Sequence, residues 1–298
     1  MFQTAGDPEV WAIPWQAETY VIHYRRDLLQ KAGVDEAAAF RTHADLESTA
    51  KKLAQSDVDI PVELTLLADR YGTLHALASW LWGNGCEFFS EDGRQSLLNQ
   101  PKALDAIRHY FGLLRLITPQ GRQWMIAQNA TPLFHMGHSA MTFGTMNLTM
   151  PQVQVPPEVT ANWGWAALPQ PCFVGGSHLA IWKHTRNKRA ALQLIEFLTR
   201  ASTLITINRS LATLPPRLAL LNTPEFTNNP MLKVMADAIK SGRTYQPLHL
   251  WGLLEDKIVS ALLKIGSEIL ARPEENSDEI IRREIDTLSN RLGIILSQ

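Results

Sequence analysis

The sequence predicts a mixed α/β protein that is large enough for two domains. Short stretches rich in β-branched and aromatic residues alternate with helical stretches along the 298 residues. At about 150 residues per domain, this length suggests two domains or one large one. The sequence has no run of 18 or more apolar residues, the length that a membrane-spanning helix requires.

The first half of the chain alternates between extended and helical segments. Thr19–Tyr24 combines β-branched and aromatic residues and predicts a strand. A helix over Arg26–Ala32 is expected to end at the glycine that follows it. Thr42 and Asp45 have the spacing of a capping box, which predicts a helix over Ala44–Gln55. The next expected elements are a buried strand at Pro61–Leu66 and an apolar helix at Gly72–Trp82. A turn at Ser90–Gly93 and a helix from Pro101 onward, capped by Asn99, should follow.

The second half contains further strands and then becomes helical. Three strands are expected, the first two separated by a proline-rich connection, at Ser139–Phe143, Trp163–Leu168 and Leu179–Trp182. After these strands, one helix is predicted at Lys188–Leu198. Two long amphipathic helices, around Leu253–Leu270 and Ser277–Leu296, end the chain.

The charge balance and the cysteines exclude several classes of protein. Twenty-eight Lys and Arg against 29 Asp and Glu give a net charge of −1, without the basic surplus of a nucleic-acid-binding protein. Cys86 and Cys172 form neither a CxxC pair nor a zinc spacing, so we expect two unpaired thiols.

Candidate catalytic and cofactor motifs are incomplete. Gly137–Met141 approaches a G-x-S-x-G nucleophile elbow, but Met replaces the last Gly and the expected strand follows the Ser instead of preceding it. His135 and His138 could share a helix face, yet no further residue completes a metal-ligand set. Gly83–Phe88 lacks the last Gly of a dinucleotide fingerprint and follows a helix. We therefore expect no metal and no cofactor. An enzyme is unsupported by these motifs, and its one conceivable basis is a glycosidase pair of carboxylates, Glu18 and Asp69.

The aromatic residues are the unusual feature of the composition, with nine Trp, five Tyr and ten Phe. Rings beside carboxylates are typical of a sugar-binding cleft, because a pyranose stacks on a ring while its hydroxyls bond to carboxylates. Any single Trp is more often a core residue. The aromatic residues beside turn or strand-end signals are Trp15, Tyr71, Trp80, Trp82 and Trp251.

Four ordered segments carry a resemblance to a known family. They are AIPWQAETYVIHYRRDLLQKAG from Ala12, FHMGHSAMTFG from Phe134, GGSHLAI with NKRAALQLIEFL from Gly175, and LATLPPR from Leu211. In this order and spacing they resemble the extracellular solute-binding proteins of ABC importers, the family that contains maltose-binding protein. The resemblance covers nearly the whole chain.

This resemblance implies a type II periplasmic-binding-protein-like fold, in which two lobes joined by a hinge close on a ligand. It implies a non-enzymatic protein that passes a small solute, a sugar or sugar derivative, to ABC permease subunits in the periplasm or on the extracellular face of the membrane. The same fold could bind a glycerol phosphodiester, a polyamine or iron. A truncated or sensory derivative without transport activity is a further alternative.

The resemblance also implies which residues bind the ligand. Glu18 occupies the position of an acidic sugar ligand on the hinge strand, and Asp69 with Tyr71 resembles an acid–x–Tyr pair on the far wall. The loop Gly175, Gly176 and Ser177 would let a ligand approach the backbone closely, and Trp15 and Trp251 are added from local context. Thr145–Asn147 stand where many relatives have a stacking Trp, so no stacking platform is expected there. For a phosphate ligand, Arg217 is the available cation.

The expected lobes differ in completeness. Residues 1–18 and 169–218 would form the remainder of the first lobe, and residues 19–168 and 219–298 the second. Met1–Val10 lacks the basic and apolar regions of a signal peptide, and about 100 residues of the family's first lobe have no counterpart. We therefore expect an incomplete first lobe, a monomer only when that lobe is whole, and exposed apolar surface on Leu179–Ile181 and Leu192–Leu198 unless a partner segment covers it.

Overall fold

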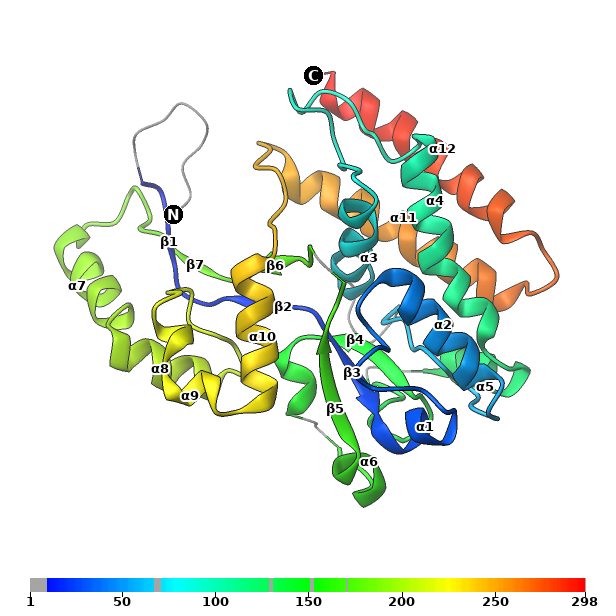
Figure 1. The fold of residues 1–298 in the computed structure, drawn as a ribbon. Coiled ribbons are helices and arrows are strands. Elements are labelled where there is room, and N and C mark those ends of the chain that lie inside the picture. The colour runs from blue at the N-terminus through cyan, green and yellow to red at the C-terminus, as the bar shows by residue number, and fades with distance from the viewer. Residues whose placement is uncertain (1–9, 67–70, 129–130, 151–152, 170, 298) are drawn as a thin grey trace.

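One extended segment runs through the middle of the molecule and connects its two ends. The computed structural model describes residues 10–66, 71–128, 131–150, 153–169 and 171–297 (Figure 1). Within the segment, β1 (Ile13–Pro14) pairs with β7 (His178–Leu179), and β2 (Glu18–Thr19) pairs with β6 (Val174–Gly175). All four strands are short, and both pairs are antiparallel.

The same segment continues into the central strand of a three-stranded sheet. β3 (Val21–Arg25) lies between β4 (Met141–Gly144) and β5 (Trp163–Ala167), and both pairings are antiparallel. All five residues of β3 are buried, as its density of β-branched and aromatic side chains predicts.

Helices cover the sheet and form the main hydrophobic core on one side of the molecule (Figure 1). The long helices α11 and α12 pack against each other, and both contact the helices of the first half of the chain. The bounds of these elements are α1 (Arg26–Lys31), α2 (His43–Ala54), α3 (Gly72–Gly83), α4 (Pro101–Gly112), η1 (Leu113–Leu116), α5 (Pro119–Ala127), η2 (Met146–Thr149), α6 (Pro157–Ala161), α11 (Trp251–Ala271) and α12 (Ser277–Leu296).

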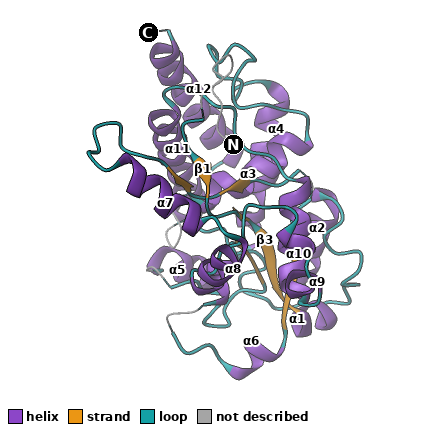
Figure 2. Cartoon of the chain, turned by 90° about the vertical axis from the view of Figure 1, so that its left-hand side faces the viewer, coloured by secondary structure: helices purple, strands orange, loops and turns teal. Residues whose placement is uncertain are grey.

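A smaller group of helices lies beside β1 and β7 at the other end of the molecule, as the side view shows (Figure 2). A second apolar cluster joins Ala17 and Leu214 to Phe226 and Met235, so α9 and α10 pack against the extended segment. The bounds are α7 (Lys188–Leu198), α8 (Ala201–Ser210), η3 (Leu220–Asn222), α9 (Pro224–Thr227) and α10 (Pro230–Ser241).

Most predicted helices are confirmed, and their caps explain why. Thr42 and Asp45 form the predicted capping box at the start of α2, and Gly33 has the left-handed φ of 64° expected after α1. The predicted cap of α4 is wrong: the N-cap is Gln100, not Asn99, and its side chain makes no capping hydrogen bond. Cys86 and Cys172 are both free and buried.

Two predicted strands are only partly correct. Pro61–Leu66 is buried, but it touches its neighbour through isolated bridges, such as Glu63 to Thr142, and not through a continuous ladder. The strand expected at Leu179–Trp182 is limited to His178–Leu179 in β7. Strand pairing depends on distant partners, which local composition does not specify.

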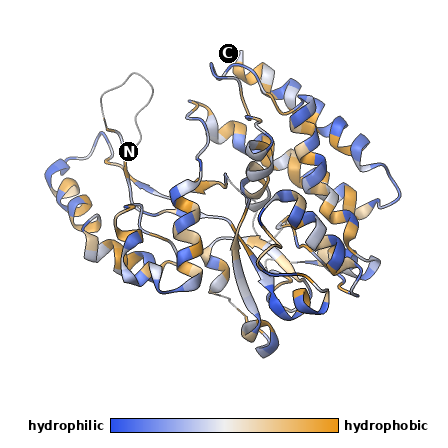
Figure 3. Cartoon of the chain, viewed as in Figure 1, coloured by the Kyte–Doolittle hydropathy of each residue, from blue (hydrophilic) through white to orange (hydrophobic). Residues whose placement is uncertain are grey.

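The predicted exposure of apolar residues is confirmed on α7, whereas Leu179 and Ile181 are half-buried. This helix buries none of its residues, and Leu192 and Phe197 are 58% and 51% exposed. Trp182 beside it is 71% exposed. In Figure 3, hydrophobic and hydrophilic residues alternate along the ribbon of α7. No single helix in the described residues meets the length and hydropathy of a membrane span; α7 and α8 do so only as a pair bent by 75°.

Candidate functional site

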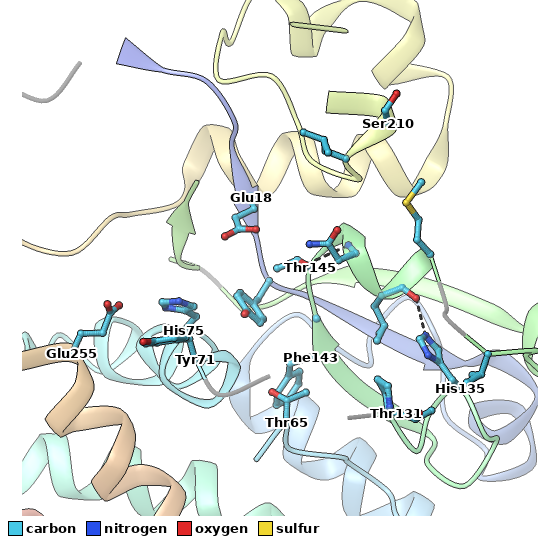
Figure 4. A pocket seen from close by; sticks show the side chains of 18 residues that line it. Glu18, Thr65, Tyr71, His75, Thr131, His135, Phe143, Thr145, Ser210 and Glu255 are labelled. Carbon is cyan, nitrogen blue, oxygen red and sulfur yellow. Dashed lines mark hydrogen bonds between the residues drawn. The ribbon is translucent and has the colours of Figure 1, made fainter. Parts of the chain in front are cut away.

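A cavity of about 940 Å³ lies where the extended segment passes between the two ends of the molecule (Figure 4). Its walls come from β2, β4, η2, α3, α8 and α11 and from the loop before β4. The described residues that line it are Glu18, Tyr20, Thr65, Tyr71, His75, Thr131, Pro132, His135, Phe143, Gly144, Thr145, Asn147, Leu148, Met150, Val153, Ser210, Leu211 and Glu255.

Strand alternation directs Glu18 and Tyr20 toward the cavity. Successive side chains of an extended chain point to opposite faces, so residues 18 and 20 share one face. Thr19 lies on the other face, where its hydroxyl donates a 2.7 Å hydrogen bond to the carbonyl of Phe173. Across the ladder, Glu18 is paired with Gly175. The pairing of β2 with β6 therefore fixes the position of the carboxylate.

The first turn of α3 supplies an aromatic wall. Tyr71 and His75 are four residues apart and lie on one helix face, with ring centroids 6.2 Å apart and an angle of 20° between the planes. The Tyr71 hydroxyl donates to Asp256 on α11 at 3.2 Å. His75 Nδ1 lies 2.8 Å from the Tyr245 hydroxyl, and burial lowers the pKa of His75 to about 3. His75 is therefore neutral at pH 7.

The loop that forms the opposite wall is held by a buried carboxylate. Both oxygens of Glu63 accept hydrogen bonds, from the backbone N–H groups of Leu133 and Phe134, both at 2.8 Å, from Gln128 Nε2 at 2.7 Å and from Ser139 Oγ at 3.0 Å. Burial raises the pKa of Glu63, and these four donors oppose that effect. Because Thr131 and Pro132 line the cavity, Glu63 holds part of its wall in place.

His135 lines the same wall and connects it to η2. Its Nε2 lies 2.7 Å from the carbonyl of Leu148 in η2, so the loop and η2 are joined at the cavity edge. Burial lowers the pKa of His135, and the bond to Leu148 opposes that effect. His138, which the sequence places three residues further along, lies elsewhere, with its ring stacked on Trp124 at a centroid distance of 4.2 Å. Among the described residues, no group of three or more His, Cys, Asp or Glu is arranged to hold a metal ion.

The ionised groups that line the described part of the cavity are carboxylates. Glu18 and Glu255 line it, whereas no Lys or Arg is found among the described lining residues. Burial raises the pKa of Glu255, a hydrogen bond from Trp251 lowers it, and the charge of Asp256 raises it further. The described lining thus contains acidic side chains and no Lys or Arg.

The structure brings two of the predicted site residues to the cavity, Glu18 and Tyr71. Asp69 lies outside the described residues. Five others do not line the cavity: Trp15, Gly175, Gly176, Ser177 and Trp251. The ring of Trp251 stacks instead on Tyr245, with 4.4 Å between the ring centroids.

The loop at residues 175–177 contacts the protein's own backbone. Gly176 has φ of +139°, and a Cβ there would collide with the carbonyl oxygen of Gln16. The Ser177 carbonyl accepts hydrogen bonds from the N–H groups of Trp15 and Gln16, at 2.9 and 3.2 Å. The close approach that requires Gly176 is thus made by the extended segment.

The residues that the sequence did not indicate are His75, His135, Glu255 and the polar residues of η2. They come from four separate elements, and only packing brings them together. The spacing of His75 four residues after Tyr71 is the one local signal that could have indicated it.

Comparisons with known proteins agree with this architecture. The sequence profile of a protein family, described as bacterial extracellular solute-binding protein, matches residues 2–234 of this chain. A probable ABC transporter-binding protein of Deinococcus radiodurans is 24% identical over 200 residues, which is 64% of this chain and 47% of that protein. This chain thus spans about half the length of that curated relative.

Solved structures show the same fold at low sequence identity. The sugar-binding protein MalE of Xanthomonas citri superposes with a TM-score of 0.77 at 19% identity, over 96% of this chain and 70% of that one. A maltose-bound MalE3 of T. maritima superposes with a TM-score of 0.72 at 21% identity, over 95% of this chain and 73% of that chain. UgpB of Mycobacterium tuberculosis, in complex with glycerophosphocholine, superposes with a TM-score of 0.73 at 18% identity, over 98% of this chain and 73% of that chain.

The predicted periplasmic-binding-protein-like fold is confirmed by these MalE-like structures. The family match covers well over half of the 298 residues. This chain is a member of the bacterial extracellular solute-binding protein family.

Proposed function

We propose that this protein is the substrate-binding component of an ABC importer and binds a sugar or sugar derivative in the cavity between its two ends. The cavity of about 940 Å³ carries the proposal, because its volume suits a small polyhydroxylated solute and its walls mix rings with carboxylates and hydroxyls. The assignment of two lobes, 1–18 with 169–218 and 19–168 with 219–298, belongs to the same proposal.

The polar groups of the cavity support a polyol ligand. Glu18 offers carboxylate oxygens as acceptors for sugar hydroxyls, and Tyr71 offers a ring face. The buried Thr65 hydroxyl makes no hydrogen bond within the described part of the chain. Buried hydroxyls normally have a partner, which a solute hydroxyl would provide.

A glycerol phosphodiester is the second candidate, because the relative UgpB is known in complex with glycerophosphocholine. A phosphate group would need a cation, and Arg217 is not among the described lining residues. The carboxylates among the described lining residues disfavour the phosphate group of such a solute. Asp69, Gly175, Gly176, Ser177, Trp15 and Trp251 remain proposed contributors to the site or its support.

Delivery to permease subunits outside the cytoplasmic membrane follows from the family and is part of the proposal. The relative from Deinococcus radiodurans is described as a probable ABC transporter-binding protein. A solute-binding role requires no catalysis, and we propose none for this chain.

Titration of the protein with sugars and with glycerophosphocholine, followed by Trp fluorescence, tests the proposal. Trp251, four residues before Glu255 on α11 and stacked on Tyr245, should report occupancy of the cavity. Glu18→Gln should weaken binding of the active sugar by about 1.5–3 kcal/mol, because charge-assisted hydrogen bonds are lost. Glu196→Gln on exposed α7 is the matched control and should bind normally. An unchanged affinity of Glu18→Gln removes Glu18 from the site, and binding of glycerophosphocholine alone replaces the sugar assignment.

A further inference from the structure

One corner of the cavity combines a carboxylate with aromatic rings. Glu255, in the second turn of α11, lies beside Tyr71 and His75 of α3 (Figure 4). The hydrogen bond from Tyr71 to Asp256 holds the start of α3 against α11. The stacked rings of Tyr71 and His75 form the side of this corner.

Glu255 has no cationic partner in the described chain. It is half-buried, and no Lys or Arg nitrogen of the described residues lies within 4.0 Å of its carboxylate. The groups that act on it are a hydrogen bond from Trp251 and the negative charge of Asp256. Lys257, two residues further along α11, lines a separate groove between α11 and α12. Partial burial of a carboxylate is unfavourable, and an opposite charge beside it would stabilise it.

The rings beside Glu255 suit a cation as well. The face of a Tyr ring attracts an ammonium group, and this attraction increases when water is excluded. Burial keeps His75 neutral, so that ring adds no positive charge to the corner. A solute group placed here would meet one carboxylate and one aromatic face.

We propose that this corner binds a positively charged amine or ammonium group of the solute, with Glu255 as its counter-ion and Tyr71 as its aromatic contact. This inference rests on the proposed function, because it assigns a chemical class to the solute of the same cavity. The cargo would then be an amine-bearing polyhydroxylated solute.

Matched probes separate charge from shape. D-glucosamine, D-glucose and N-acetyl-D-glucosamine share one ring, and only the first carries a cation. Tetramethylammonium and tert-butanol repeat the comparison without a sugar. Each is titrated into the full chain by ligand-observed NMR, and into the variants Glu255→Gln, Tyr71→Leu and the control Glu196→Gln. Urea unfolding of each variant shows whether it is folded.

We expect glucosamine to bind about tenfold more tightly than glucose, the ratio that one charge-assisted hydrogen bond provides. Glu255→Gln should reduce this ratio to below about twofold, Tyr71→Leu should reduce it in part, and Glu196→Gln should preserve it. Tetramethylammonium should bind more tightly than tert-butanol, again only with Glu255 present.

The other outcomes have separate meanings. Glucose or N-acetylglucosamine binding as tightly as glucosamine overturns the cation subsite and leaves the sugar function standing. A preference for glucosamine that survives in Glu255→Gln also overturns it. Binding of tetramethylammonium through Glu255, without binding of any sugar, retains the subsite and removes the sugar assignment. Binding of neither cation refutes the subsite.

Discussion

The two ends of the molecule differ in how far they bury their apolar side chains. Around β3 the apolar residues are enclosed on every side: Ile22, Leu46 and Leu64 are completely buried. At the other end, α7 has equally apolar positions but leaves Leu192, Leu194 and Phe197 more than half exposed. Amphipathic sequence thus forms a helix in both places, whereas burial depends on what lies opposite.

The cavity lies between these ends, and the buried end forms most of its wall. Tyr71, His75, Phe143 and Glu255 all come from elements that pack around the main core. From the other end, Ser210 and Leu211 contribute at the end of α8. A well-packed wall facing a less enclosed one is the arrangement that a closing cleft would use.

Lowering the pH should reduce the free energy of unfolding, chiefly through groups in the buried end. Burial lowers the pKa of His23 and of His75 to about 3, from 6.5. Between these two values the unfolded chain binds more protons than the folded chain, so stability present above pH 6.5 is lost as pH falls toward 3. Each histidine should contribute up to about 1.4 kcal/mol of lost stability per pH unit. Urea unfolding at pH 7.5, 6.5, 5.5 and 4.5 measures this.

His23→Gln distinguishes this cause from the titration of carboxylates. His23 Nε2 bonds to the Gly144 carbonyl at 3.3 Å, and Nδ1 accepts from Trp163 Nε1 at 3.1 Å. A Gln side chain can both donate and accept but does not titrate. The variant should therefore lose less stability per pH unit than the parent, and an equal loss contradicts the assignment.

Removing one carboxylate charge should lower stability much more at the buried end than at the exposed end. Glu63→Gln replaces one acceptor oxygen with an NH2 donor that faces the N–H group of either Leu133 or Phe134, and should lower the free energy of unfolding by about 3 kcal/mol. Glu196→Gln removes only the exposed pair with Arg200 and should cost less than about 0.5 kcal/mol. Chemical unfolding measures both, and similar losses would mean that Glu63 is not held as described.

Local sequence predicted the helices better than it predicted the site. Lys188–Leu198 is a helix over the predicted bounds, because a 3.6-residue period and flanking polar residues determine it locally. The strand at Leu179–Trp182 was overestimated, since its partner is β1, more than 150 residues away. Glu18 and Tyr71 were indicated by the family resemblance, whereas His75 and Glu255 approach each other only through the packing of α3 on α11. Packing of distant segments has no local signal.

The smallest expected effect tests whether the exposed end is exposed in solution. Leu192→Ala on α7 should change the free energy of unfolding by less than about 0.5 kcal/mol, because the side chain is 58% exposed and leaves no cavity. Leu46→Ala, a truncation of the same residue type in a helix whose Leu is fully buried, should cost about 3 kcal/mol. The cost of truncating a Leu depends on the apolar surface around it and so measures its burial directly. A loss above about 2 kcal/mol for Leu192→Ala would therefore mean that another polypeptide surface covers α7 in the purified protein, and the difference between the two ends would then be one of partners and not of sequence.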